Sequence, residues 1–321
     1  MSTAVISSRS AAPAATPMRI SVLRSHDSLV KVWLILVTAA AGFALLIRHG
    51  MQLDFLSCGA AVGTVALLLP FAVAFDNRGI PQFANLLTGF LFMVVFNLFL
   101  TILTYAGTPL NAALVDGQLI QFDAAMGIHL PSIVEFSRRH PNLQWWLSMS
   151  YASVLPSTLL AIVVLGCDRD VKRLQNFVMT FMIAGLITSV VFFVTPAEGP
   201  FAAYGYELRA DQQRFLDHFR ALRSQQFPVV SMSNLEGLIT FPSFHTTWAV
   251  LLAFGFRHYR WLFVPMLLLN CAVAASTMTT GWHYGSDVAG GLLTAAAAVA
   301  AARLLTRDAS EKSPQLHSAN P

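Results

Sequence analysis

Long apolar runs, separated by short polar or charged segments, cover most of the chain. A helix needs about 20 largely apolar residues to cross the hydrocarbon core of a bilayer. Runs of this kind, the sixth shorter than the others, fall at residues 30–47, 54–75, 84–106, 143–166, 173–195, 244–257, 260–280 and 286–305. The pattern predicts an all-α, polytopic membrane protein with about eight transmembrane helices. The two ends, residues 1–29 and 306–321, are expected to be disordered tails, the first of them cytoplasmic.

Composition supports a membrane protein and argues against other classes. Of the 321 residues 55% are hydrophobic and 11% are charged, whereas soluble domains carry about 25% charged residues. The net charge is +4, but the basic residues form short clusters between the apolar runs, which is typical of membrane topology and not of nucleic-acid binding. Cys58, Cys167 and Cys271 share no short spacing, so neither a metal site nor a disulfide framework is expected.

The charge clusters predict how the chain is oriented. Residues 167–173 and 257–260 carry basic clusters between spans, and both ends of the chain add basic residues; in an eight-span model all of these fall on one side. By the positive-inside rule these segments are cytoplasmic. Two long connections, 107–142 and 196–243, then lie on the outer side. We expect short interfacial helices in the first and a charged helix at about 207–224 in the second.

Polar residues that suit catalysis occur in two places, residues 241–246 and 280–287, which open the sixth and eighth spans. Ionisable groups near membrane depth are functional candidates by default. Because the last three spans run up and down in short hairpins, both segments lie on one face, and His245 and His283 can converge. Each segment also begins a helix, so free backbone N–H groups there are expected to form an anion site.

His283 and Asp287 are spaced i, i+4, which brings a carboxylate within reach of an imidazole on a helical turn. The carboxylate would fix the tautomer and leave the other ring nitrogen as a nucleophile, while His245 would act as the acid for the leaving oxygen. Taken alone, a His-x-x-x-Asp match arises easily by chance, and a single histidine is often an interfacial residue bonded to a carbonyl. The pair of histidines on one predicted face is the more specific observation.

At these residues the sequence resembles the type 2 phosphatidic acid phosphatase superfamily of membrane lipid phosphatases and their haloperoxidase relatives. The second motif of that family, Pro-Ser-x-His, matches residues 242–245, and the third, Ser-Arg-x(5)-His-x(3)-Asp, matches Ser276 to Asp287 with one change. The resemblance implies a six-helix core over residues 84–305, preceded by two additional helices within 30–83. It also implies that His283, His245 and Asp287 are catalytic and that Ser243, Gly281 and Thr277 bind phosphate.

The chain departs from the family pattern in its cations. Thr277 stands where the third motif usually has an arginine, and the first motif, Lys-x(6)-Arg-Pro, is incomplete because no lysine lies between Lys172 and Lys312. Replacement cations are expected in the second outer connection, at Arg209, Arg214, Arg220 and Arg223. Each of these could equally belong to a solvated helix face. The segment 195–200 and the Thr-Gly-x-His-Tyr form of the third motif look more like the branch that contains inositol phosphorylceramide synthases.

These features predict an integral enzyme of the cell membrane whose partners are the bilayer and a lipid phosphate or phospholipid substrate. A phosphohistidine would form on His283, on the extracytoplasmic face, and water or a second lipid alcohol would accept the phosphate, so phosphatase and lipid phosphotransferase both stay open. No metal ion or other cofactor is required by this chemistry. A transporter with a proton site at the two histidines, or a catalytically silent scaffold, are the alternatives from other classes.

Overall fold

The computed structural model describes residues 25–311, with side chains to residue 305. Its helices are α1 (His26–Arg48), α2 (Gly59–Arg78), α3 (Pro81–Gly107), α4 (Asp116–Ala125), α5 (Leu130–Arg139), α6 (Pro141–Ala152), α7 (Val154–Gly166), α8 (Lys172–Val194), α9 (Pro200–Ala203), α10 (Ala210–Arg223), α11 (Phe244–Phe256), α12 (Arg260–Thr279) and α13 (Gly285–Glu311). The predicted all-α membrane fold is confirmed. The predicted tails fall largely outside the described residues, although α1 begins four residues before the predicted first span and α13 continues past residue 305.

Six of the described helices, α1, α2, α3, α8, α12 and α13, are long and apolar enough to cross a membrane. Helices α6 and α7 replace the predicted span at 143–166 with two pieces bent by 44°, and α11 is a shorter apolar helix of 13 residues. The bend falls at Ser153, three residues before Pro156. A proline cannot donate to the carbonyl four positions earlier and its ring clashes with that carbonyl, which explains why the helix breaks there.

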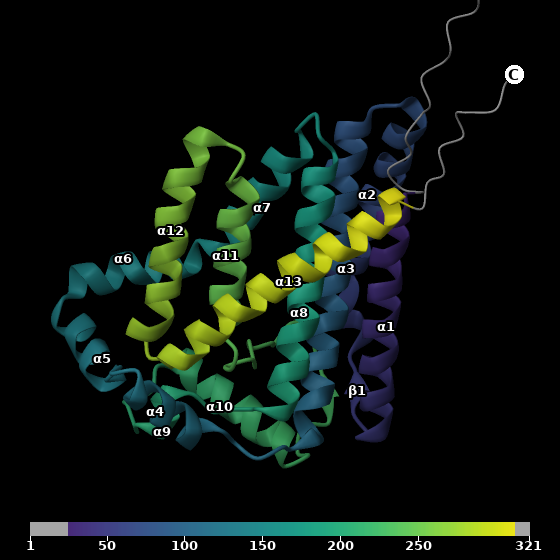
Figure 1. Cartoon of the computed structure of the whole chain (residues 1–321). Helices are drawn as coiled ribbons and strands as arrows, with labels where there is room; N and C mark the ends of the chain where they lie inside the picture. Colours follow the sequence, from purple (N-terminus) through teal and green to yellow (C-terminus); the bar gives the residue numbers. More distant parts are fainter. Residues whose placement is uncertain (1–24, 312–321) are drawn as a thin grey trace, which may run out of the picture.

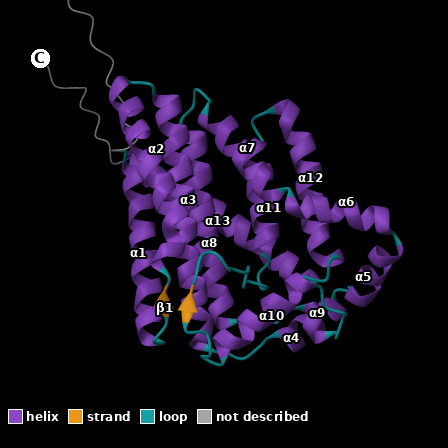
Figure 2. Cartoon of the chain, turned by 180° about the vertical axis from the view of Figure 1, so that it is seen from behind, coloured by secondary structure: helices purple, strands orange, loops and turns teal. Residues whose placement is uncertain are grey.

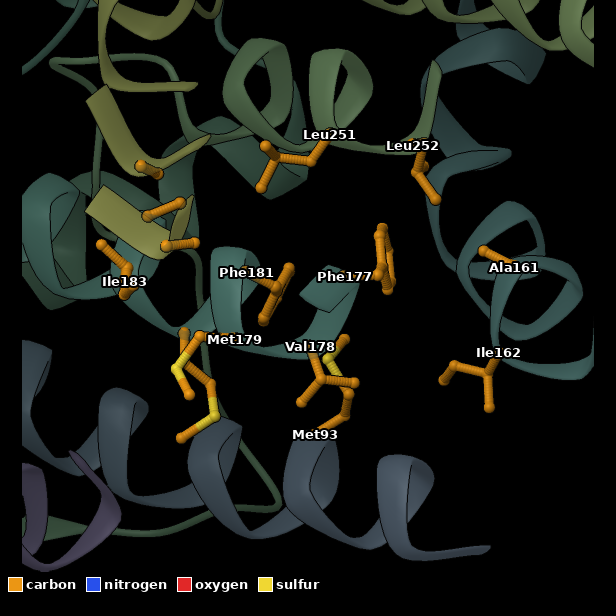
Figure 3. Packing of buried hydrophobic residues seen from close by; sticks show 14 of the residues in the cluster. Met93, Ala161, Ile162, Phe177, Val178, Met179, Phe181, Ile183, Leu251 and Leu252 are labelled. Carbon is orange, nitrogen blue, oxygen red and sulfur yellow. The ribbon is translucent and has the colours of Figure 1, made fainter. Parts of the chain in front are cut away.

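The helices form two groups that α13 crosses diagonally (Figure 1). Helix α3 packs against α1, α2 and α8 in one group, and α11 packs against α7 and α12 in the other, while α13 contacts both α8 and α11. Buried side chains from α3, α7, α8 and α11 meet between the groups (Figure 3). The labelled members of this core include Met93, Ile162, Phe177, Val178, Phe181, Leu251 and Leu252. Burial of these apolar surfaces fixes the position of α11 relative to α13.

The first predicted helix is joined to the rest of the bundle by a buried polar chain. Lys31 of α1 is fully buried, and its Nζ donates to Gln175 Oε1 of α8 over 2.6 Å. Gln175 Nε2 in turn donates to Asn85 Oδ1 of α3 over 2.6 Å. Because a buried polar group is costly unless it is hydrogen-bonded, this network holds α1 in one register against α3 and α8.

The two ends of the bundle differ in structure. The turns between α7 and α8 and between α11 and α12 lie at one end, and α4, α5, α9 and α10 cover the other (Figure 1). At the covered end β1 (Gln52–Leu53) pairs in parallel with β2 (Val229–Val230), which ties the α1–α2 connection to the segment before α11 (Figure 2). The covered end therefore has a layer of short elements that can enclose a site.

Candidate active site

His245 and His283 face each other at the covered end, with their ring centroids 6.4 Å apart. His245 lies in the first turn of α11, and His283 lies in the turn between α12 and α13. His283 Nδ1 is 3.1 Å from Asp287 Oδ2, which is the predicted i, i+4 contact. When Asp287 is ionised it can only accept a hydrogen bond, and Nδ1 of His283 then carries the proton while Nε2 keeps its lone pair.

The two helices that carry these residues touch closely at their first turns. The backbone N–H of Ser243 donates to the Asp287 carbonyl over 3.0 Å, and Thr247 Oγ1 donates to the Gly291 carbonyl over 3.1 Å. A Cβ atom on Gly291 would lie only 2.6 Å from the Ser243 carbonyl oxygen. Only glycine permits this approach, which sets the separation of the two histidines.

Tyr151 of α6 also contacts His245. The Tyr151 hydroxyl is 3.1 Å from His245 Nδ1, and the two rings are stacked with centroids 4.2 Å apart. The bend between α6 and α7 brings Tyr151 to this position. With Nδ1 engaged by the hydroxyl, Nε2 is the nitrogen of His245 that is available to a substrate.

Two aspartates of α4 hold the segment that contains His283. Asp123 Oδ2 and Oδ1 accept hydrogen bonds from the backbone N–H groups of Gly285 and Ser286 over 2.8 and 2.7 Å. Asp116 accepts the Tyr284 hydroxyl over 2.9 Å and also the backbone N–H groups of Glu198 and Gly199. The α4 helix is thereby fastened to the start of α13 and to the segment after α8.

These bonds correct the sequence-based expectation of an anion site formed by two helix starts. At α13 the first backbone N–H groups are already bonded, those of Gly285 and Ser286 to Asp123 and that of Tyr284 to Asp287 Oδ2 at 2.9 Å. A helix N-terminus attracts an anion through its unpaired N–H groups. Here the carboxylates of Asp123 and Asp287 already accept hydrogen bonds from these N–H groups, so the N–H groups of Tyr284, Gly285 and Ser286 are not available to a phosphate.

A cavity of about 360 Å³ opens onto the histidines. Its wall includes His245 and His283 together with Trp282, Thr240 and Tyr151. The wall also includes the apolar side chains of Leu100, Leu238, Ile239 and Phe244. Within the described part of the chain, no lysine or arginine lines this cavity, and two carboxylates, Asp211 and Glu236, do. The cavity wall thus combines polar and apolar side chains.

The other motif residues lie behind the cavity wall. Ser243 is fully buried and its Oγ accepts from the backbone N–H of Thr246 over 3.3 Å, which caps α11. Thr277 is also buried and donates to the Ala274 carbonyl over 2.7 Å. Gly281 adopts φ +78° in the turn that leads to His283. All three shape the two turns, and none of them is part of the cavity wall.

The four candidate arginines are distributed unevenly around the site. Arg209 forms a two-point ion pair with Asp211, at 3.1 and 3.0 Å, and lies 6.0 Å from the Trp282 ring. Arg214 pairs with Glu236 at 2.7 Å. In each case the partner carboxylate lines the cavity, so Arg209 and Arg214 stand at its rim.

The remaining two arginines lie farther along α10. Arg220 pairs with Glu198 through two bonds of 2.7 and 2.8 Å. Arg223 donates to the Ala112 carbonyl over 2.9 Å, and burial lowers the pKa of its guanidinium. Neither belongs to the cavity wall. Their contacts join α10 to the connection before α4, through Ala112, and to the connection before α9, through Glu198.

Burial also affects His283. It lowers the pKa of the His283 imidazole below its ordinary value, and a hydrogen bond to the Thr240 backbone opposes part of this effect. The neutral imidazole is therefore the prevailing form at neutral pH, and a neutral ring is the nucleophilic form.

Within residues 25–305, no cluster of three or more His, Cys, Asp or Glu side chains is arranged to hold a metal ion.

Sequence reasoning missed Asp116, Asp123 and Tyr151. The two aspartates are spaced by seven residues, which places them on one face of a helix, and Leu119 between them is buried on that face. An acidic pair beside a buried leucine was an available signal. Tyr151 gave none, because its contact with His245 depends on the bend between α6 and α7.

Comparison with known proteins connects this geometry to a family. No curated protein and no solved structure matches the chain. The sequence model of the PAP2 superfamily matches residues 117–301, a range that contains Asp123, both histidines and Asp287. The match covers more than half of the chain, and the chain therefore belongs to the PAP2 superfamily.

Proposed function

We propose that this protein is a membrane enzyme that cleaves a lipid-linked phosphate ester through a phosphohistidine on His283. Membership of the PAP2 superfamily supports a phosphatase-like function. The single observation that carries the finer proposal is the cavity onto which both His245 and His283 open, with Asp287 bonded to His283 from behind.

In the first step Nε2 of His283 attacks phosphorus. A P–N bond forms, the bond from phosphorus to the lipid oxygen breaks, and that oxygen takes a proton from Nε2 of His245, which must enter this step in its protonated, cationic form. The positive charge that develops on the His283 ring is stabilised by the Asp287 carboxylate on Nδ1. Asp287 contacts Nδ1 of His283 and Tyr151 contacts Nδ1 of His245, so we assign the substrate contacts to Nε2 of each ring.

In the second step an oxygen nucleophile attacks the phosphohistidine. His245, now neutral, takes the proton of the attacking hydroxyl, the P–N bond breaks and His283 leaves as a neutral imidazole. With water the reaction is hydrolysis, and with a lipid alcohol it is phosphotransfer. The apolar wall formed in part by Leu100 and Ile239 suits an acyl chain for either acceptor.

Arg209 is the best-placed replacement for the missing arginine of the third motif. It lies beside Trp282 and pairs with Asp211 on the cavity wall. A guanidinium with five donors can keep its carboxylate partner and still donate to a phosphate oxygen. Arg214, paired with Glu236, is a second candidate of the same kind. Ser243, Gly281 and Thr277 act by shaping the turns that carry the histidines.

We place the reaction on the extracytoplasmic side. The basic turns 167–173 and 257–260 join α7 to α8 and α11 to α12, at the end of the bundle opposite the starts of α11 and α13, where the two histidines occur in the chain (Figure 1). The positive-inside rule makes those turns cytoplasmic, and the cavity then opens toward the outer leaflet.

The test uses purified protein in detergent with a panel of phosphatidic acid, lipid pyrophosphate and phospholipids. Free phosphate and new phospholipid species are both measured, which separates hydrolysis from transfer. A radiolabelled phosphate should remain on the protein after rapid quenching, in an acid-labile and base-stable form. We expect His283→Ala to abolish both turnover and labelling.

His129→Ala is the matched control, because His129 is an exposed histidine that bonds only Ser132 within α5 and its connection. It should keep the wild-type rate. A His283→Ala variant that retains more than about a tenth of the rate would contradict the nucleophilic role. Turnover without a labelled intermediate would leave the substrate class intact and remove the covalent mechanism.

A further inference from the structure

A second cavity lies at the opposite end of the bundle from the histidines. It has a volume of about 160 Å³ and lies where the start of α8 meets the end of α11. Its wall includes Arg173, Asn176, Phe177, Phe254, Arg257 and His258. These residues have no part in the proposed reaction, and His245 lies at the other end of α11 from Arg257.

Two arginines, Arg173 and Arg257, line this cavity, and Arg303 approaches the Phe254 ring of its wall. The Arg257 guanidinium lies 3.7 Å from the centre of the Phe254 ring, and Arg303 of α13 lies 5.5 Å from the same ring. Arg173 completes the group from the first turn of α8. Partial burial, followed by the charges of Arg303 and Arg173, lowers the pKa of Arg257. Guanidinium groups this close repel one another, so an anion between them is stabilising.

The carboxylates near the cavity are already engaged. Asp168 accepts from Arg173 over 3.1 Å and from the Tyr259 hydroxyl over 2.5 Å. Asp170, which is itself part of the cavity wall, lies 3.5 Å from the same Arg173. Among the described residues, Arg257 makes no ion pair, and its Nη1 donates to the Phe254 carbonyl over 2.7 Å. The protein thus leaves the charge of Arg257 without a carboxylate of its own.

We propose that this cavity binds a phosphate group, carried by an anionic phospholipid of the leaflet on this side or by a free phosphate ion. Arginine is suited to this ligand because its planar fork donates two parallel hydrogen bonds to phosphate oxygens. Stacking on Phe254 holds the Arg257 fork in place, and the exposed Asn176 amide adds a neutral donor on the same wall. A bound phosphate would bridge α8 and α11, and through Arg303 also α13.

The position in the membrane favours a lipid headgroup as the source. The cavity lies beside turns that separate two pairs of spanning or apolar helices, α7 from α8 and α11 from α12. Headgroup phosphates lie at this level of the bilayer, and basic side chains near an anionic surface each contribute about 1 kcal/mol of attraction. Phe177 and Phe254 give the cavity an apolar floor, which suits the first carbons of a lipid glycerol group.

The experiment measures the thermal unfolding of the whole protein in a neutral detergent during three titrations: dihexanoyl phosphatidylglycerol, dihexanoyl phosphatidylcholine and inorganic phosphate. A ligand that binds the folded state raises the unfolding temperature with its concentration. We compare the wild type with Arg257→Gln and with the matched control Arg260→Gln, which removes an exposed arginine three residues away that is not part of the cavity wall. Every titration is repeated in a His283→Ala background, which separates this cavity from the histidine site.

Phosphatidylglycerol should raise the unfolding temperature of the wild type and of Arg260→Gln, and phosphatidylcholine should not. Arg257→Gln should need at least about tenfold more phosphatidylglycerol than the wild type for the same rise in unfolding temperature. Arg257→Lys keeps the charge but loses the planar guanidinium, so the concentration that it needs should lie between those of the wild type and Arg257→Gln. A response to inorganic phosphate that is also lost in Arg257→Gln identifies the free ion as a ligand, and its absence identifies the lipid. Equal responses in Arg257→Gln and the wild type, or no response to either anion, would overturn the proposal.

Discussion

Asp123 Oδ1 accepts a hydrogen bond from the backbone N–H of Ser286 over 2.7 Å. The bond joins α4 to the first turn of α13, one residue before Asp287 and three residues after His283. A helix start is costly to bury without partners for its N–H groups, and Asp123 supplies partners for two of them. The orientation of the His283–Asp287 pair therefore depends on a residue that does not touch the cavity wall.

Asp123→Ala should lower both stability and activity. It leaves the N–H groups of Gly285 and Ser286 buried without an acceptor, which costs about 1–3 kcal/mol, and it releases the turn that positions His283. Thermal unfolding in detergent and the rate of phosphate release measure the two effects. Asp123→Asn keeps one carbonyl acceptor, so its unfolding temperature and its rate should lie between those of the wild type and Asp123→Ala. Asp217→Ala removes an exposed aspartate of α10 and serves as the control. Wild-type activity in Asp123→Ala would show that the turn with His283 keeps its conformation without the hydrogen bonds to Asp123.

Gly291→Ala should disrupt the contact between α11 and α13. The added Cβ would lie 2.6 Å from the Ser243 carbonyl oxygen and 2.9 Å from Thr246 Cβ, so the helices must move apart. Overpacking of this kind costs about 1–3 kcal/mol, and the separation of the two histidines would change with it. We expect a rate at least about tenfold lower, by analogy with the effect of small displacements on catalysis.

Gly63→Ala is the matched control for that variant, since it also adds a methyl group within a helix, where no atom lies within 4 Å of the new Cβ. It should leave the rate unchanged. If Gly291→Ala and Gly63→Ala were equally active, the close approach of the two helices would not be needed for the reaction.

The acidic side of the pH–rate profile reports the protonation of His283. Burial lowers the pKa of His283, and only the neutral ring can attack phosphorus. The value of kcat/KM should therefore hold as the pH falls through the ordinary histidine pKa of about 6.5, and it should decline only at lower pH. Asp287→Asn removes a carboxylate that favours the protonated ring, so the decline should shift to still lower pH while the maximal rate falls by about 10²–10⁴.

That pair of profiles separates a catalytic carboxylate from a merely structural one. A structural role for Asp287 would change the height of the profile and leave its shape alone. A decline already centred above pH 6.5 in the wild type would mean that the charged ring is stabilised at this site, contrary to the effect of burial.

The convergence of His245 and His283 could be predicted because it depends only on local features. Two short turns between three consecutive apolar helices put the starts of α11 and α13 on one face, and the i, i+4 spacing brings Asp287 to His283 in any helical turn. The family's motifs cover these same residues. The prediction that His245 and His283 converge required only the order of the helices along the chain, and it did not require knowledge of how the helices pack.

The parts that sequence reasoning missed depend on packing between distant segments. Asp123 reaches Gly285 and Ser286 across 162 and 163 residues of chain, and nothing in the spacing of α4 indicates which helix start it will meet. The expected anion site at α13 was wrong for the same reason, because another part of the protein bonds those N–H groups. The ion pairs of Arg209 and Arg214 likewise depend on how α10 docks.

The side of the membrane on which the reaction occurs can be tested with single cysteines. The native Cys58, Cys167 and Cys271 carry free thiols, two of them exposed, and are first replaced by serine or alanine. Ser224, directly after α10, and Arg169, in the turn between α7 and α8, are both exposed. They lie at opposite ends of the bundle, so a thiol reagent that cannot cross the membrane should reach only one of them in intact cells.

We expect Ser224→Cys to react in intact cells and Arg169→Cys to react only after lysis, because the basic turn at 167–173 favours the cytoplasm by the positive-inside rule. Both variants should react equally in detergent, which controls for the reactivity of each thiol. The opposite pattern in intact cells would invert the topology. The cavity with His245 and His283 would then open to the cytoplasm, and its lipid substrate would have to come from the inner leaflet.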